Sequence, residues 1–408
     1  MTAPSPTNSS QQESIAPRLG VLQVTIGPYP EVRGGIDMLV KTLVEGHRDE
    51  DCRITVFVPG SWEQRRLRRE TTRDGIPVYT RRLRMPYGPS KPLRHLLGWL
   101  LEAPFVIRAL LKVCREQRID VIHVHSAPSY LAYFRVLLLF GGPVYIVTFH
   151  RGEVVNYGRR RWIERQLIRW GLQGAKFTTA VSKWLAQEAK HTFPSLALPP
   201  NIIYNGLCMD SIRHELSTSS VLSAPGRYFL IVAALYPYKG QDVAIEAWPR
   251  IVRHDPSLKL LIAGEGPYRP DYERLIKQQE CDDSIYLIGQ RPHCEILSLM
   301  AGAIALIVPS RNEGFGYVVL EASAVGTPVI CSDIAPLNEI VEDGKSGLLF
   351  GLESTLELCT AAISLAKDPG RRSELASSLR RRTIDDFGLA EMARRYKQLY
   401  ADAVANNS

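Results

Sequence analysis

The segment Arg311–Glu321 places two carboxylates and two glycines around the start of a predicted helix. Gly314 and Gly316 let a ligand approach the backbone closely, and amides at a helix N-terminus attract phosphate. Glu321, eight positions after Glu313, can accept hydrogen bonds from a ribose diol, and Glu313 can bind sugar hydroxyls in the same way. An ordinary helix with an acidic start shares part of this pattern. Because a sugar nucleotide needs phosphate, ribose and sugar contacts together, the spacing favours a sugar-nucleotide site.

A lysine, Lys239, follows the apolar run Tyr228–Ala233 and precedes Gly240. In a loop between a strand and a helix, a lysine can neutralise a diphosphate leaving group as a point charge. Taken alone, a loop lysine is more often a solvated surface residue. Lys239 and Glu313 both follow strands of one predicted sheet, however, so we expect them to face the same cleft.

Two further loops after predicted strands carry candidate binding residues. Gly34 and Gly35 open a helix after the first strand, which suits close approach of a phosphate or a sugar. His150 follows the strand Val144–Phe149. We expect His150 to donate a hydrogen bond to a sugar hydroxyl or to help position an acceptor.

Neither a metal nor a dinucleotide cofactor is indicated. The seven cysteines are scattered without a C-x-x-C pair, which fits a reducing, cytoplasmic compartment. His123 and His125 end another strand, and with His150 they could form a metal set; hydrogen bonds from these two histidines to neighbouring backbone are the favoured interpretation. Asp49–Asp51 lies in a polar loop away from strand ends. The spacing at Gly264–Gly266 lacks the third glycine of a dinucleotide fingerprint. No cofactor or metal is therefore expected.

Apolar runs of strand length alternate with amphipathic stretches of helix length along the chain. Several runs are rich in Val, Ile and Leu without polar alternation, which is typical of parallel strands buried on both faces. The alternation predicts an α/β protein with two doubly wound, Rossmann-like domains facing a central cleft. The strands are expected at residues 20–26, 54–58, 121–124, 144–149, 177–181, 202–204, 228–233, 259–263, 284–287, 305–308 and 328–331.

The expected domain boundaries follow changes in composition. A tail at 1–17 is rich in Ser, Thr, Pro and Gln, and we expect it to be disordered. The first domain spans 18–210, a polar, Ser-rich linker spans 211–226, and the second domain spans 227–386. Residues 387–408 are expected to contain a helix that packs back on the first domain.

These features together resemble the family-4 retaining glycosyltransferases, whose two-domain architecture is called GT-B. The resemblance covers most of the chain, from the glycine pair at 34–35 to Gly347–Leu349. It is specific for the family and leaves the substrates open. The matching segments are Asp120–His125, Ala180–Lys183, Tyr204–Gly206, Lys239–Gly240, Gly264–Pro267, the pair Glu313 and Glu321, Glu321–Pro328 and Glu339–Gly344.

The resemblance implies a role for each candidate residue. Lys239 would bind the donor diphosphate, Glu321 the ribose and Glu313 the transferred sugar, with His150 near the reacting centre. The nucleobase would lie near the loop Gly289–Arg291, which makes Arg291 a donor-binding candidate. Backbone amides would hold phosphate or sugar at Gly35, Gly314, Phe315 and Gly316.

The resemblance also implies a reaction. A sugar would pass from a nucleotide-sugar donor to a glycan or lipid-linked acceptor, with retained anomeric configuration and without a bound metal. The expected setting is the biosynthesis of a surface polysaccharide or glycolipid. A nucleotide-sugar epimerase of similar architecture, which would turn over donor without an acceptor, and a catalytically silent binding relative are the alternatives.

The chain departs from the family pattern at two positions. Where relatives commonly have Gly-Arg-Leu, this chain has Ala233–Leu235, so the arginine that would be the second diphosphate cation is replaced by Ala234. Arg311 or Arg291 is the expected substitute. Cys208 stands where an Asp is common, and Asp210 is expected to take its role. These changes leave altered donor choice and lost activity open.

Positive charge is concentrated in the first half of the chain. Residues 1–210 contain 29 Lys and Arg against 17 Asp and Glu, whereas the remainder contains 21 against 25. Within Arg65–Leu111, arginines precede the apolar segments Leu96–Leu101 and Phe105–Leu111, a composition that suits an interfacial helix on anionic lipid. An ordinary core helix beside a solvated basic face fits equally well. No nucleic-acid recognition motif accompanies the charge, so nucleic acid is not expected as a partner.

Overall fold

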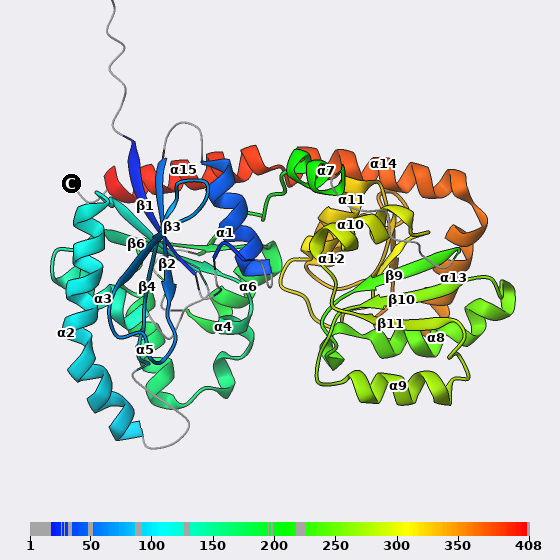
Figure 1. Ribbon diagram of the computed structural model, residues 1–408, viewed down its shortest axis with the longest axis horizontal. Coiled ribbons are helices and arrows are strands. Elements are labelled where there is room, and N and C mark those ends of the chain that lie inside the picture. Colours follow the sequence, from blue (N-terminus) through cyan, green and yellow to red (C-terminus); the bar gives the residue numbers. More distant parts are fainter. Residues whose placement is uncertain are drawn as a thin grey trace, which may run out of the picture.

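The computed structural model describes residues 18–25, 27, 29–31, 35–47, 52–85, 92–125, 131–194, 196, 199–217 and 226–405. Two α/β domains lie side by side, each built on one largely parallel sheet (Figure 1). The prediction of two Rossmann-like domains is thereby confirmed. The predicted tail at 1–17 lies outside the described residues.

The first sheet has eight strands in the order β3-β4-β2-β1-β5-β6-β7-β8, and all pairs are parallel except β3 with β4. Every residue of its strand β6 is buried, as the unbroken apolar run predicts. The strands are β1 (Leu19–Val24), β2 (Cys52–Pro59), β3 (Arg68–Thr71), β4 (Pro77–Arg81), β5 (Val121–His125), β6 (Val144–Phe149), β7 (Phe177–Ala180) and β8 (Asn201–Ile202). The helices are α1 (Gly35–Gly46), α2 (Pro92–Glu116), α3 (Leu131–Leu139), α4 (Gly152–Val155), η2 (Tyr157–Arg159), α5 (Trp162–Leu172) and α6 (Lys183–Thr192).

The second sheet has six parallel strands in the order β11-β10-β9-β12-β13-β14. The strands are β9 (Tyr228–Val232), β10 (Lys259–Ala263), β11 (Ile285–Gly289), β12 (Leu306–Val308), β13 (Val329–Ser332) and β14 (Leu348–Phe350). The helices are η3 (Pro237–Lys239), α8 (Gln241–His254), α9 (Arg269–Gln278), α10 (His293–Gly302), α11 (Tyr317–Val325), α12 (Leu337–Ile340), α13 (Thr355–Lys367) and α14 (Pro369–Asp386).

The segment between the domains differs from the expected linker. Residues 211–217 belong to helix α7 (Met209–Ser217), which packs against α10 and α11 of the second domain. Ile212 is buried, and Met209 and Leu216 pack partly buried against the same core, so the segment has an apolar face despite its polar composition. The rest of the predicted linker, up to residue 225, lies outside the described residues.

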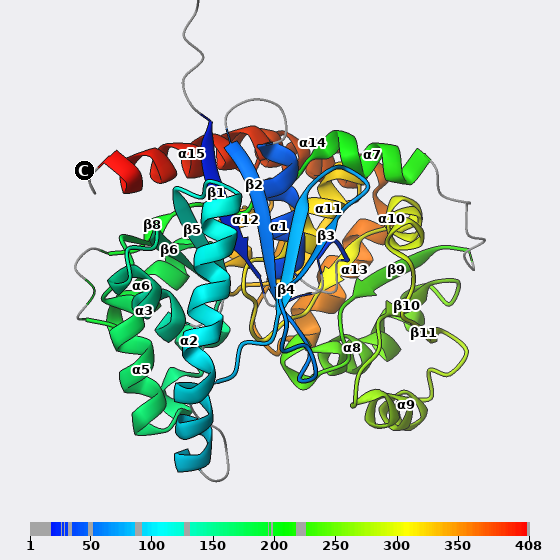
Figure 2. The ribbon, with the colours of Figure 1, turned by 60° about the vertical axis from the view of Figure 1, so that its left-hand side comes forward.

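The last helix, α15 (Leu389–Ala405), continues from α14 and crosses to the first domain, where it packs against α1, β5 and β6. Figure 1 and Figure 2 both show it lying along that domain. Tyr400 of α15 is fully buried and hydrogen-bonds to His123 Nδ1 (2.8 Å), while His123 Nε2 contacts Thr148 Oγ1 (2.6 Å). The expected backbone partners for His123 are therefore wrong, since its partners are buried side chains.

Hydrogen bonds to one carboxylate join the two domains beside the cleft. Glu339 of the second domain accepts hydrogen bonds from the amides of Lys183 and Trp184 at the start of α6, both at 2.8 Å. The same carboxylate accepts a bond from the Tyr204 hydroxyl (3.0 Å). A carboxylate at a helix N-terminus is favourable, so this contact orients the two domains across the cleft.

Candidate functional site

A cavity of about 340 Å³ lies in the cleft, lined by loops from both domains. The loops follow β6, β9 and β12 and meet the start of α1, in agreement with the rule that ligands bind beyond the carboxyl ends of parallel strands. The predicted residues that line it are Gly35, His150, Lys239, Glu313, Gly314, Phe315 and Gly316. Gly34 lies outside the described residues.

A salt bridge joins the two charged candidates of the second domain. Lys239 Nζ lies 2.6 Å from Glu313 Oε2, with both side chains largely buried. Glu313 also accepts hydrogen bonds from the amide of Gly314 (3.1 Å) and the hydroxyl of Ser310 (3.4 Å). Removing either charge would leave the other buried without its partner, which is costly. The pair therefore fixes both side chains at the cavity wall.

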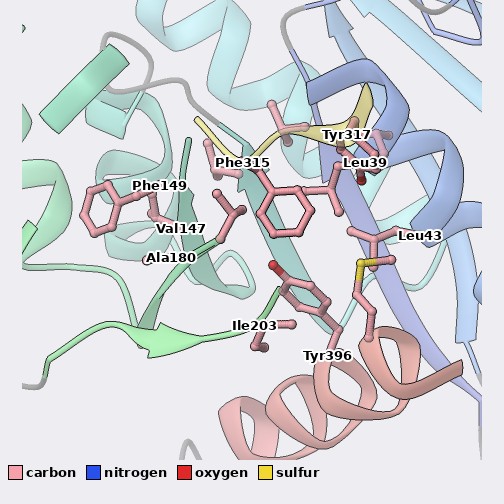
Figure 3. Packing of buried hydrophobic residues seen from close by; sticks show 14 of the residues in the cluster. Leu39, Leu43, Val147, Phe149, Ala180, Ile203, Phe315, Tyr317 and Tyr396 are labelled. Atoms are coloured by element: carbon pink, nitrogen blue, oxygen red, sulfur yellow. The ribbon is translucent and has the colours of Figure 1, made fainter. Parts of the chain in front are cut away.

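Helix α11 begins at this wall. Its N-cap is Gly316, at φ 107°, and within the described residues no side chain caps this end of the helix. A Cβ at Gly314 would approach the His150 carbonyl oxygen to 3.1 Å, so the two domains lie in close contact here. The Phe315 ring is buried in the apolar core near Leu39 and Tyr396 (Figure 3), and Phe315 also belongs to the lining of the cavity.

The hydrogen-bond network behind His150 fixes its tautomer. Gln23 Nε2 donates to the Tyr400 hydroxyl, so Gln23 Oε1 accepts a bond from His125 Nε2 (2.7 Å). Burial lowers the pKa of His125, whose ring is neutral and accepts through Nδ1 from His150 Nε2 (3.4 Å). Burial also lowers the pKa of His150 to about 3. His150 Nδ1 is therefore an acceptor, whereas the sequence predicted a donor toward a sugar hydroxyl.

Glu321 does not line the cavity that holds Lys239 and Glu313. Its carboxylate, on the second turn of α11, faces His293 Nε2 at 3.1 Å, and His293 Nδ1 lies 2.9 Å from Glu215 of α7. Burial alone lowers the pKa of His293, but bonds and charges from Glu215 and Glu321 outweigh it and raise that pKa to about 10. A charged imidazolium therefore holds Glu321 in place.

The interaction of His293 with Glu215 and Glu321 predicts how the stability of the protein depends on pH. Because the pKa of His293 is raised above its ordinary value of 6.5, its contribution to the free energy of unfolding is fully present below pH 6.5. That contribution is lost as the pH rises through about 10. Denaturant unfolding of the wild type and His293→Gln at pH 6 to 10 measures it, with the exposed His254→Gln as control. The two free energies of unfolding should converge toward pH 10, and a constant difference would contradict the bridge.

The two arginines predicted to replace the absent cation at 234 are engaged elsewhere. Arg311 bonds both oxygens of Asp242 (2.8 and 2.7 Å) and both of Glu353 (2.5 and 2.6 Å), and the bonds to these carboxylates raise its pKa. Arg291 donates to the Ile288 carbonyl (3.1 Å) and does not line the cavity. The expectation that Arg311 or Arg291 completes the diphosphate site is not supported by their positions.

Three cavity residues were not singled out from the sequence. Asn205 is buried, and its Oδ1 has no hydrogen-bond partner in the described part of the chain. Arg151 and Tyr238 face each other across the domain boundary. All three lie within or beside segments that carry the family resemblance, so adjacency to a motif was the available signal. Within the described ranges, no group of three His, Cys, Asp or Glu residues is placed to hold a metal ion.

Two family profiles match the chain. The profile described as "Glycosyl transferase 4-like domain" matches residues 34–195, and the profile "Glycosyl transferases group 1" matches residues 213–382. Among curated proteins, the alpha-D-kanosaminyltransferase of Streptomyces kanamyceticus is 32% identical over 273 residues, which are 63% of this chain and 70% of that protein.

Solved structures share the whole architecture. Sucrose-phosphate synthase from Thermosynechococcus elongatus superposes with a TM-score of 0.75 at 21% identity, over 95% of this chain and all of that one. The Anabaena protein Alr3699/HepE in complex with UDP and glucose gives 0.71 at 18% identity, over 94% of this chain and all of that one. At sequence identities of 21% and 18%, the similarity of these structures to this chain shows a shared fold. With both family profiles and the curated relative, it shows that this chain belongs to the family-4 type, group 1 glycosyltransferases of GT-B architecture and is a transferase.

Proposed function

We propose that this transferase moves a sugar from a nucleotide-sugar donor to a glycan or lipid-linked acceptor and retains the anomeric configuration. The observation that carries the proposal is the Lys239–Glu313 pair beside the open N-terminus of α11 in one cavity. A cation and free amides suit a diphosphate, and a carboxylate suits sugar hydroxyls. The UDP and glucose held by the Anabaena neighbour belong to the same donor class.

In the proposed reaction, Lys239 leaves its ion pair with Glu313 and binds the donor diphosphate. The Glu313 carboxylate is then available to bind hydroxyls of the sugar. The bond from the anomeric carbon to the diphosphate breaks as the acceptor hydroxyl attacks from the same face. A donor phosphate oxygen takes the proton of that hydroxyl. Lys239 and the amides at the start of α11 stabilise the negative charge on the leaving diphosphate. His150 Nδ1 accepts a hydrogen bond from a hydroxyl of the transferred sugar and so orients that sugar.

An acceptor-dependence assay tests the transfer itself. Purified protein is incubated with UDP-, GDP- or ADP-sugars, with and without lipid and oligosaccharide extracts as acceptors. We expect the release of nucleoside diphosphate to depend on acceptor and a glycosylated product to form. Identical donor turnover with and without every acceptor would contradict a transferase reaction on such acceptors.

We also propose that helix α2 attaches the protein to an anionic membrane face, where a lipid-linked acceptor is accessible. α2 lies on the side of the first domain away from the second domain (Figure 1, Figure 2). It exposes Leu97, Leu100, Leu101 and Phe105, each between 52% and 73% exposed, at helical spacing. Basic residues follow on the same helix at Arg108, Lys112 and Arg115. An apolar stripe beside cations is typical of interfacial binding.

Part of the predicted basic region has a structural role instead. Arg82 is buried, forms an ion pair with Glu102 and donates to the Trp62 carbonyl (2.7 Å). It is therefore unavailable to lipid headgroups. No helix within the described residues is long and apolar enough to cross a bilayer.

Vesicle sedimentation tests this attachment. The variant Leu101→Ser/Phe105→Ser should bind phosphatidylglycerol vesicles about 100-fold more weakly than the wild type at low salt, because two exposed apolar side chains are lost. Leu356→Ser/Ile384→Ser, which alters exposed apolar residues of the second domain, is the matched control and should bind like the wild type. A wild type that ignores anionic vesicles would refute the attachment.

A further inference from the structure

The proposed donor diphosphate site has one cation from its own domain, Lys239, and no second one from that domain among the described lining residues. Family relatives commonly have an arginine where this chain has Ala234, and Ala234 is exposed with nothing charged in its place. Lys239 is the one cation that the second domain contributes to the cavity wall among the described residues. A diphosphate carries more charge than one lysine can neutralise, so a second positive group is needed.

Arg151 of the first domain is the other cation at the cavity wall. It lies between β6 and α4, directly after His150, with a positive φ of 108°. Its guanidinium carbon is 5.7 Å from the centre of the Tyr238 ring, and Lys239 Nζ lies 5.7 Å from the same centre. The Tyr238 ring thus lies close to two cations that come from opposite domains.

The hydrogen-bond donors of Arg151 are unused. Its side chain makes no hydrogen bond or ion pair with any described residue, and its Nε is buried without a partner. Burial lowers the pKa of Arg151, and the charges of Glu313 and Tyr238 oppose that change. An arginine nevertheless stays charged in proteins. Leaving the Nε donor buried and unpaired costs free energy, which an anion in the cavity bound by the guanidinium would offset.

We propose that Arg151 binds the donor diphosphate as its second cation, in place of the arginine absent at position 234. This inference rests on the proposed nucleotide-sugar donor. The diphosphate would then bridge Lys239 of one domain and Arg151 of the other. A donor would draw the domains together through its diphosphate, whereas two cations on one domain would not.

Calorimetric titration separates the diphosphate from the rest of the donor. The ligands are a nucleoside diphosphate and its parent nucleoside, with the base chosen as the one that the wild type binds. Arg151→Ala should bind the diphosphate about 10- to 100-fold more weakly, the range expected for a charged hydrogen bond, and the nucleoside unchanged. The exposed Arg159→Ala makes the same charge change nearby and should bind both ligands like the wild type.

A second variant tests the replacement directly. Arg151→Ala/Ala234→Arg should recover most of the lost diphosphate affinity, because the exposed position 234 has room for the side chain. Wild-type diphosphate affinity in Arg151→Ala would overturn the role of Arg151 and leave the proposed function intact. An equal loss of nucleoside binding would also overturn it, as a sign of a structural role. A wild type that binds no nucleoside diphosphate would instead refute the donor itself.

Discussion

Replacing Lys239 with alanine is expected to lower kcat/KM for sugar transfer by about 10²- to 10³-fold, the range for loss of one preorganised charge at a developing negative charge. Lys239 is the cation that approaches Glu313 to 2.6 Å in the cavity, and η3 and Gly240 fix its backbone. Without it, the leaving diphosphate loses charge stabilisation and Glu313 loses its partner. Transfer is measured at saturating and limiting donor.

The matched control is Lys345→Ala. The Lys345 side chain is 78% exposed and forms a long ion pair with Glu342, at 3.6 Å, so its removal should change kcat/KM by less than about twofold. Thermal unfolding of both variants shows whether each is folded. A folded Lys239→Ala protein with wild-type activity would show that the lysine only balances the charge of Glu313.

Replacing Gly240 with alanine is expected to destabilise the second domain by about 2–5 kcal/mol. Gly240 has φ 69°, and left-handed backbone strain costs an L-residue about 1–2 kcal/mol. Its Cβ would also lie 1.9 Å from the Pro309 carbonyl oxygen, a backbone atom after β12, and overpacking of this kind costs about 1–3 kcal/mol. Since Gly240 follows Lys239, any shift would displace the lysine too. Denaturant unfolding measures the change.

A matching substitution at Gly226 separates backbone strain from the close approach of the Cβ. Its φ of 66° is nearly the same, but a Cβ there would meet no atom within 4 Å. Gly226→Ala should therefore cost the strain alone, about 1–2 kcal/mol. Equal losses in the two variants would contradict the close approach of Gly240 to Pro309.

The sequence predicted the central strands well, because they are buried on both faces and read as unbroken apolar runs, as in β6 and β10. Two kinds of element were missed. β3 is polar and exposed along its whole length, so no apolar pattern marks it. β14 is only three residues long, and helix α7 is largely polar and is held by packing against α10 and α11, far away in the chain.

The candidate site was predictable where a residue follows a strand. Lys239 and Glu313 meet because β9 and β12 end at one edge of the second sheet, and His150 reaches the same cavity from the carboxyl end of β6 in the first sheet. Contacts made by packing were not predictable. Glu215 and His293 lie 78 positions apart and meet only because α7 packs on α10. The orientation of Phe315 into the core and the tautomer of His150 depend in the same way on α15 and its neighbours.

Thermal stabilisation by nucleotide sugars is the sharpest test of the proposed donor site. Wild type and Glu321→Ala are melted with UDP-, GDP- and ADP-sugars at matched concentrations. We expect the Tm of the wild type to rise with one nucleotide family and that of the variant to rise much less, because we propose that Glu321, held by His293, binds the ribose. No shift of the wild type with any of these donors, or an equal shift in both proteins, would contradict it.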